Sequence, residues 1–134
     1  MKTSLIASLL AAGCACVSIS AQAQVAVVMA PSASAMTKEQ VANLYLGRSA
    51  ELTLLDLPEG SATRDLFYKK ATDREPAQVK STWSRIVFAG KGTPPKEVAD
   101  AAAVKKAVAA DPKAVGYIEK AAVDGSVKVV LLLD

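Results

Sequence analysis

The sequence of 134 residues contains no histidine and only two cysteines, Cys14 and Cys16, both near the amino terminus. Histidine and cysteine are the commonest protein ligands for zinc, copper and haem, so we expect no cofactor and no metal centre. The lack of histidine also excludes general acid–base catalysis by an imidazole. Any binding or catalysis by this chain therefore depends on hydroxyl, carboxylate, lysine, arginine and backbone groups.

Aromatic residues are scarce, at 4% of the chain, and no face of one charge is apparent, because 16 Lys/Arg are interspersed with 13 Asp/Glu. Proteins that bind nucleic acids usually show a basic stripe or a set of aromatic side chains on which bases stack. We therefore expect no nucleic acid partner. After residue 23, no run approaches the roughly 20 apolar residues that a bilayer span needs, so residues 24–134 are expected to contain no membrane span.

Residues 1–23 have the features of a secretory signal peptide. Lys2 supplies a positive charge, Leu5 to Val17 forms an apolar core, and Ala21-Gln22-Ala23 is a small-x-small cleavage signal. Cleavage after Ala23 leaves residues 24–134 as an exported chain without cysteine. The exported chain is therefore compatible with an oxidising compartment, although it has no cysteine with which to form a disulfide.

The segment around Cys14 partly resembles a lipoprotein cleavage site, because Ala11-Ala12-Gly13 precedes the cysteine. Leu10 stands one position too early for that motif, and the apolar region before Cys14 is short. We therefore do not expect lipidation of Cys14.

The chain is organised around residues 52–70, which predict a strand, a tight turn and a helix. The strand is indicated by an apolar run typical of a strand covered on both faces, formed by Leu52, Leu54, Leu55 and Leu57. Pro58-Glu59-Gly60 predicts the turn, and a helix then begins at Ser61. The first backbone N–H groups of such a helix lack intrahelical partners and lie at the positive end of the helix dipole.

Ser61 has two interpretations. Together with the hydroxyl of Thr63, its hydroxyl and the free N–H groups predict a cradle for an oxyanion. Alternatively, Ser61 merely caps the helix by accepting a hydrogen bond from one of these N–H groups. The two interpretations are compatible, because an anion competes for the same donors.

Strand-like and helical segments alternate along residues 24–134. The strand-like runs cover residues 25–29, 52–57, 115–118 and 127–133, and the helices begin near Thr37, Ser61, Pro76 and Asp100. This alternation favours an α/β fold with a largely buried sheet and about four flanking helices, in a single domain. No internal repeat is visible.

Two features of the third helix and the loop after it bear on function. Trp83 lies at helical spacing with Val79, Ile86 and Val87, which indicates a packed face and a core anchor rather than a ligand-stacking residue. Lys91 lies in the loop between Gly90 and Gly92. It is either a ligand for an anion or a solvated loop lysine.

Four segments together resemble the phosphate-type substrate-binding proteins of bacterial ABC transporters, a family of type 2 periplasmic binding proteins. Their order and spacing agree with the family over residues 37–118. The segments are Val41 to Arg48 (similar to I-F-x-G-K), Glu59 to Thr63 (similar to D-G-S-G-T), Ala89 to Gly92 (similar to G-x-K-G) and Asp111 to Ile118 (similar to P-G-A-I-G-Y-V).

The resemblance implies an anion site and a location in the periplasm. The family's Ser-Gly-Thr element binds phosphate at a helix N-terminus, which points to Ser61, Ala62 and Thr63, and Glu59 matches an accompanying acidic position. Phosphate or a similar oxyanion is the implied ligand, and an ABC permease or another envelope protein the implied partner. The candidate anion-binding residues are thus Ser61, Ala62, Thr63, Arg64, Glu59 and Lys91.

Two departures from the family pattern limit this expectation. Leu57 stands where the family usually has an arginine, and Arg64 is the nearest substitute. Residues 24–134 are also about the size of one lobe, whereas the family's proteins close two lobes on the ligand. A single lobe leaves half of the anion in water, so we expect weak binding.

Two other functions remain open from the sequence. The first alternative is a periplasmic interaction or adaptor protein that keeps the fold but has lost ligand binding. The second is an enzyme, for which Asp56, Glu59 and Asp65 are the clustered carboxylates. Without histidine, cysteine or a metal set, these acids more simply mark a strand end and a first helical turn, and we expect no enzymatic activity.

Overall fold

The computed structural model describes residues 24–134, so the predicted signal peptide and Cys14 lie outside the described residues. Among these residues are five strands and four α-helices. In chain order they are β1 (Val25–Met29), α1 (Lys38–Tyr45), β2 (Thr53–Asp56), α2 (Ala62–Thr72), α3 (Pro76–Phe88), β3 (Lys96–Glu97), α4 (Ala101–Ala110), β4 (Ala114–Glu119), the short 3₁₀ helix η1 (Lys120–Ala122) and β5 (Lys128–Leu133). The predicted α/β fold is confirmed, and the two-residue strand β3 is the strand that the sequence did not indicate.

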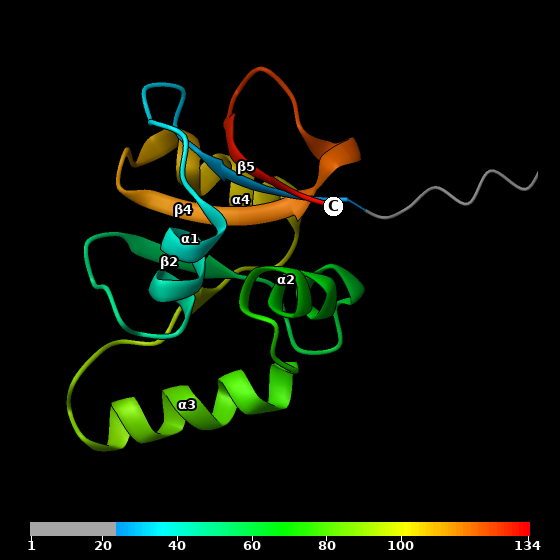
Figure 1. Ribbon diagram of the computed structural model, residues 1–134. Coiled ribbons are helices and arrows are strands. Elements are labelled where there is room, and N and C mark those ends of the chain that lie inside the picture. Colours follow the sequence, from blue (N-terminus) through cyan, green and yellow to red (C-terminus); the bar gives the residue numbers. More distant parts are fainter. Residues whose placement is uncertain (1–23) are drawn as a thin grey trace, which may run out of the picture.

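The strands form one mixed sheet in the order β3-β2-β4-β1-β5 (Figure 1). β2 is parallel to both β3 and β4, whereas β1 is antiparallel to β4 and β5. All five residues of β1 are buried, as expected for a strand at the centre of the domain. Because β2 and β4 are parallel, their carboxyl ends meet at one edge of the sheet.

Helices cover both faces of this sheet. Gly116 of β4 faces α4 so closely that a Cβ atom placed on it would lie 2.6 Å from Cγ1 of Val104, as the glycine in this strand indicated. The next residue, Tyr117, faces the opposite side, where its ring stacks on Phe67 of α2 at a centroid distance of 3.9 Å. α4 thus covers one face, α1 and α2 cover the other, and α3 lies beyond them (Figure 1).

The helix starts follow local sequence signals. Thr37 and Gln40 form the predicted capping box, in which Thr37 Oγ1 accepts from the Gln40 amide at 3.2 Å and Gln40 Oε1 accepts from the Thr37 amide at 2.8 Å. Asp100 caps α4 by accepting from the Ala103 amide at 2.9 Å. Within residues 24–134, no helix combines the length and the hydropathy that crossing a membrane requires.

Trp83 fastens α3 to the rest of the domain. Its side chain is buried, and its Nε1 donates a hydrogen bond to the backbone oxygen of Tyr45 at 2.8 Å, which confirms the prediction of a core anchor. The carboxyl end of the helix behaves differently, because Val87 is 48% exposed and Phe88 is 96% exposed. The prediction that Val87 packs inward is therefore wrong: within residues 24–134, no element covers that turn of the helix.

Candidate functional site

The turn after β2 presents the start of α2 at the carboxyl edge of the sheet. Gly60 adopts φ +88°, and the Ser61 amide donates to the Pro58 oxygen at 3.1 Å, which closes the predicted tight turn. Ser61 is the N-cap, and its Oγ accepts from the Arg64 amide at 3.3 Å. The predicted helix start and the capping interpretation of Ser61 are both confirmed.

The next two amides remain available to a ligand. The N–H groups of Ala62 and Thr63 make no hydrogen bond within residues 24–134, as expected for the first turn of a helix. Ala62 is exposed, whereas Thr63 is buried and its hydroxyl donates to Oε1 of Glu119 at 3.0 Å. Two amide donors without a partner among the described residues therefore lie at the positive end of the α2 dipole, that of exposed Ala62 and that of buried Thr63.

Ser61 and Thr63, on either side of Ala62 in the chain, border a hollow of about 450 Å³, which we call the carboxyl-edge hollow. Ser61 and Thr63 line one side, and Asp100 and Glu119 line the other, together with Leu57, Pro58, Ala99, Ala101, Ile118 and Ala122. The amino termini of α2 and α4 thus border the same hollow, beside the ends of two parallel strands. In open α/β sheets, ligands bind at this edge.

The electrostatics of the hollow are mixed. Its lining contains the carboxylates of Asp100 and Glu119 and no lysine or arginine. An anion here would gain from the amides and the helix dipoles but would be repelled by the two carboxylates, each by about 1 kcal/mol at 4 Å in water. The arrangement therefore supports weak rather than tight anion binding.

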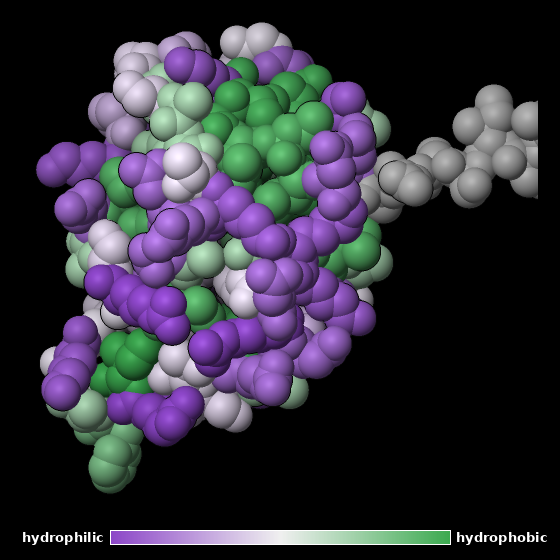
Figure 2. All heavy atoms as spheres, in the orientation of Figure 1, coloured by the Kyte–Doolittle hydropathy of each residue, from purple (hydrophilic) through white to green (hydrophobic). Residues whose placement is uncertain are grey.

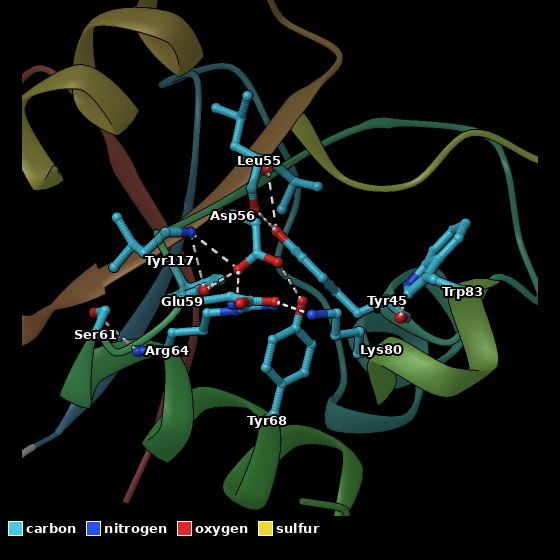
Figure 3. Close-up of polar contacts among 12 residues, drawn as sticks. Tyr45, Leu55, Asp56, Glu59, Ser61, Arg64, Tyr68, Lys80, Trp83 and Tyr117 are labelled. Carbon is cyan, nitrogen blue, oxygen red and sulfur yellow. Dashed lines mark hydrogen bonds and ion pairs between the residues drawn. The ribbon is translucent and has the colours of Figure 1, made fainter. Parts of the chain in front are cut away.

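The other predicted site residues lie elsewhere. Arg64 points to Asp56, with 3.5 Å between its Nε and Oδ1 of the carboxylate, and Glu59 pairs with Lys80 at 2.8 Å (Figure 3). Its hydrogen bond with Lys80 lowers the pKa of the Glu59 carboxyl. Lys91 borders a separate hollow beside Trp83. The structure thus brings Ser61, Ala62 and Thr63 together, but not Arg64, Glu59 or Lys91.

A cluster of buried polar side chains, which the sequence did not indicate, lies near the carboxyl ends of β2 and β4. We call it the Asp56 cluster; it consists of Asp56, Arg64, Tyr68 and Tyr117 (Figure 3). The hydroxyl of Tyr68 donates to Asp56 Oδ2 at 2.6 Å, Tyr117 donates to Oδ1, and the Leu57 amide donates to Oδ1 at 2.9 Å. The one feature of the sequence that pointed to this cluster was an aspartate within an apolar leucine run. The tyrosine partners could not be read from the sequence, because they lie 12 and 61 residues away.

The charges of this cluster balance internally. Burial and the neighbouring carboxylate raise the pKa of both Tyr68 and Tyr117, so the two phenols stay protonated and donate. Burial alone would lower the pKa of the Arg64 guanidinium, but Asp56, Tyr68 and Tyr117 together outweigh burial and raise that pKa. The cluster therefore holds a carboxylate and a guanidinium as a fixed pair, which is an arrangement suited to structure rather than to proton transfer.

Comparison with known proteins identifies the fold. No family model and no curated protein matches the chain. A phosphate ABC transporter substrate-binding protein from Clostridium perfringens, solved with bound phosphate and described as putative, is similar with a TM-score of 0.64 at 20% identity, over 81% of this chain and 45% of that one. An ABC-type phosphate transport receptor from Vibrio cholerae gives 0.60 at 21% identity, over 81% and 46%. PstS from Borrelia burgdorferi gives 0.52 at 13% identity, over 73% and 42%.

The chain thus spans less than half the length of each of these structures. At such identities the likeness concerns the fold alone. The prediction from the four sequence segments is confirmed at that level: residues 24–134 have the α/β fold of a single lobe of a phosphate-type periplasmic binding protein.

Proposed function

We propose that this chain is an exported, non-enzymatic protein that binds phosphate or a similar oxyanion weakly, through the amides of Ala62 and Thr63 beside Ser61. The observation that carries the proposal is the pair of amides without hydrogen-bond partners among the described residues, at the start of α2. They lie at the sheet edge where open α/β folds bind ligands. The structural likeness to a protein solved with bound phosphate supports the same ligand class.

The affinity should be low. The described residues form a single lobe, the lining of the hollow contains no lysine or arginine, and two carboxylates border it. An anion that stays half hydrated gains little from each hydrogen bond, so we expect a dissociation constant of about 1 mM, which corresponds to about −4 kcal/mol. A periplasmic partner such as an ABC permease would increase the affinity if it covered the hollow and excluded water.

Replacing Ala62 by proline should weaken phosphate binding about tenfold, because it removes one amide donor to the anion. Proline suits the first position of a helix, where Pro76 already begins α3. The preceding Ser61, at φ −67° and ψ 125°, has the extended conformation that a following proline requires. Titration with phosphate and sulfate, followed by the amide NMR shifts of residues 61–65, measures the effect.

Lys38→Pro is the control, because it makes the same backbone change at the first position of α1; it also removes an exposed ion pair with Asp73. It should leave the phosphate affinity unchanged. If about 10 mM phosphate shifts no amide around Ala62 relative to chloride at equal ionic strength, or if Ala62→Pro binds like the parent protein, the proposed site is wrong.

Replacing Glu119 by glutamine should strengthen phosphate binding about fivefold. The change removes the negative charge of the carboxylate that lines the hollow and accepts a hydrogen bond from the Thr63 hydroxyl. The repulsion between such a charge and an anion about 4 Å away in water is about 1 kcal/mol. Glutamine keeps an oxygen that accepts the Thr63 hydroxyl. Glu39→Gln, at an exposed position of α1, is the control for the change in net charge; equal effects of the two variants would show that the hollow is not involved.

A second candidate function is an interaction protein of the periplasm that uses this fold for docking. The exposed carboxyl end of α3, with Phe88 almost entirely in solvent, favours it. Recovery of a stoichiometric envelope partner whose binding does not respond to phosphate would support this function over the first.

A further inference from the structure

The carboxyl end of α3 exposes a large apolar surface. Phe88 is 96% exposed, and Val87 beside it is 48% exposed. In Figure 2, hydrophobic atoms protrude at the end of this helix, away from the rest of the domain. A fully exposed phenyl ring is costly in water, and buried aromatic anchors of this kind dominate the energetics of many protein interfaces.

A groove lies directly beside this ring. It has a volume of about 500 Å³, and we call it the α3 groove. One wall is the inner face of α3, the other is the loop into β3 with Pro94 and Pro95, and the apolar lining from the helix is Val79, Trp83, Val87 and Phe88. Asp56, Arg64 and Tyr68 of the Asp56 cluster also line the groove. The groove thus combines an apolar strip from α3 and the two prolines with polar side chains such as Lys80, Ser84 and Glu97, and it is large enough to admit a phenyl ring.

Two charges near the ring and the groove complement each other. Arg85 is exposed one turn before Phe88, and Glu97 lines the groove. Neither forms an ion pair with another described residue, whereas the other charged side chains of the groove are paired, Lys80 with Glu59 and Arg64 with Asp56. A cation beside the protruding ring and an anion inside the groove would meet if the ring of one copy entered the groove of another.

We propose that two copies of this chain associate through α3, with Phe88 of each copy in the α3 groove of the other and Arg85 paired with Glu97 of the partner subunit. A two-fold arrangement brings the same patch of both copies together, so a patch that carries both a protruding ring and a groove is complementary to itself. Each contact is then made twice. The inference is independent of the proposed function, because the α3 groove and the carboxyl-edge hollow share no lining residue.

Sedimentation equilibrium of the purified protein tests the proposal. The parent protein should form dimers at micromolar to millimolar concentration, and Phe88→Ala should raise the dissociation constant at least tenfold. Arg85→Glu and Glu97→Arg should each weaken the dimer, and the double variant should restore it, because the two charges are exchanged. Thermal melts test whether each variant is folded, which we expect for substitutions at exposed positions.

Leu132→Ala is the matched control, since Leu132 is an exposed apolar residue of β5. It should leave the dimer unchanged. The proposal is overturned if the protein remains monomeric at about 1 mM, if Phe88→Ala dimerises like the parent protein, if Leu132→Ala abolishes the dimer, or if the two charge reversals fail to compensate for each other.

Discussion

Replacing Asp56 by alanine is expected to destabilise the domain by about 3–5 kcal/mol, the cost of leaving one partner of a buried ion pair without the other. Asp56 is 7% exposed, and the buried Nε atom of Arg64, which makes no hydrogen bond, has this carboxylate as its counter-ion. The hydroxyls of Tyr68 and Tyr117 also lose their acceptor. Urea unfolding followed by circular dichroism measures the loss, which is large beside a typical domain stability of about 5–15 kcal/mol.

Two further variants identify the cause. Asp56→Asn keeps an oxygen that accepts from the tyrosines but removes the charge, so it should cost less than alanine. The pair Asp56→Leu with Arg64→Met removes both charges together and should recover much of the lost stability, because an apolar pair of similar volume replaces a buried ion pair well. A loss below about 1 kcal/mol for Asp56→Ala would show that solvent, not Arg64, balances this carboxylate.

The Asp56 cluster also positions the candidate anion site. The Leu57 amide is bonded to Asp56 Oδ1 and, at 3.1 Å, to the Tyr117 hydroxyl, which fixes the last residue before the turn. Arg64, from the first turn of α2, is held by the same carboxylate. The cluster thus fixes both ends of the segment that presents Ala62 and Thr63. Arg64 therefore stabilises this segment through its ion pair with Asp56, whereas the sequence suggested it as an anion ligand.

Elements with local signals were predictable from the sequence. The capping box of Thr37 and Gln40, the cap at Asp100 and the turn at Gly60 each depend on residues within a few positions of one another. Four strands, β1, β2, β4 and β5, were visible as apolar runs, and in β1 the run is unbroken because a strand buried on both faces needs apolar residues at every position. The start of α2, and with it the candidate anion site, was therefore readable from about ten residues.

Features that depend on distant residues were not predictable. β3 has two exposed residues, Lys96 and Glu97, and exists through its pairing with Leu55 and Asp56. The importance of Asp56 arises from Tyr117, on a strand 61 residues later in the chain. The exposure of Phe88 depends on which element lies opposite α3. The spacing of apolar residues along a helix cannot show which element that is. Tertiary packing, rather than local propensity, decides each of these features.

The second large effect is expected for Trp83→Ala, which should destabilise the domain by about 3–5 kcal/mol, the usual cost of removing a buried tryptophan. Val79 and Trp83 are the two buried side chains of α3. The indole also fills the space beside Gly47 and Gly92, where Cβ atoms placed on the glycines would lie 3.4 and 3.7 Å from the ring. Without it, Val79 and the partly buried Ile86 would be the apolar side chains left to hold the helix against the domain.

Hydrogen exchange separates a local effect from a global one. In Trp83→Ala, the amides of α3 should exchange faster than those of β1 and β4, because the helix opens while the sheet stays folded. Trp83→Phe keeps most of the buried area but loses the hydrogen bond to the Tyr45 oxygen, so it should cost about 1–2 kcal/mol. Ser81→Ala, at an exposed position of the same helix outside the α3 groove, is the control and should change stability by less than about 0.5 kcal/mol. Uniform loss of protection in α3 and the sheet would contradict the view that Trp83 fastens α3 alone, because it would mean that helix and sheet unfold as one unit.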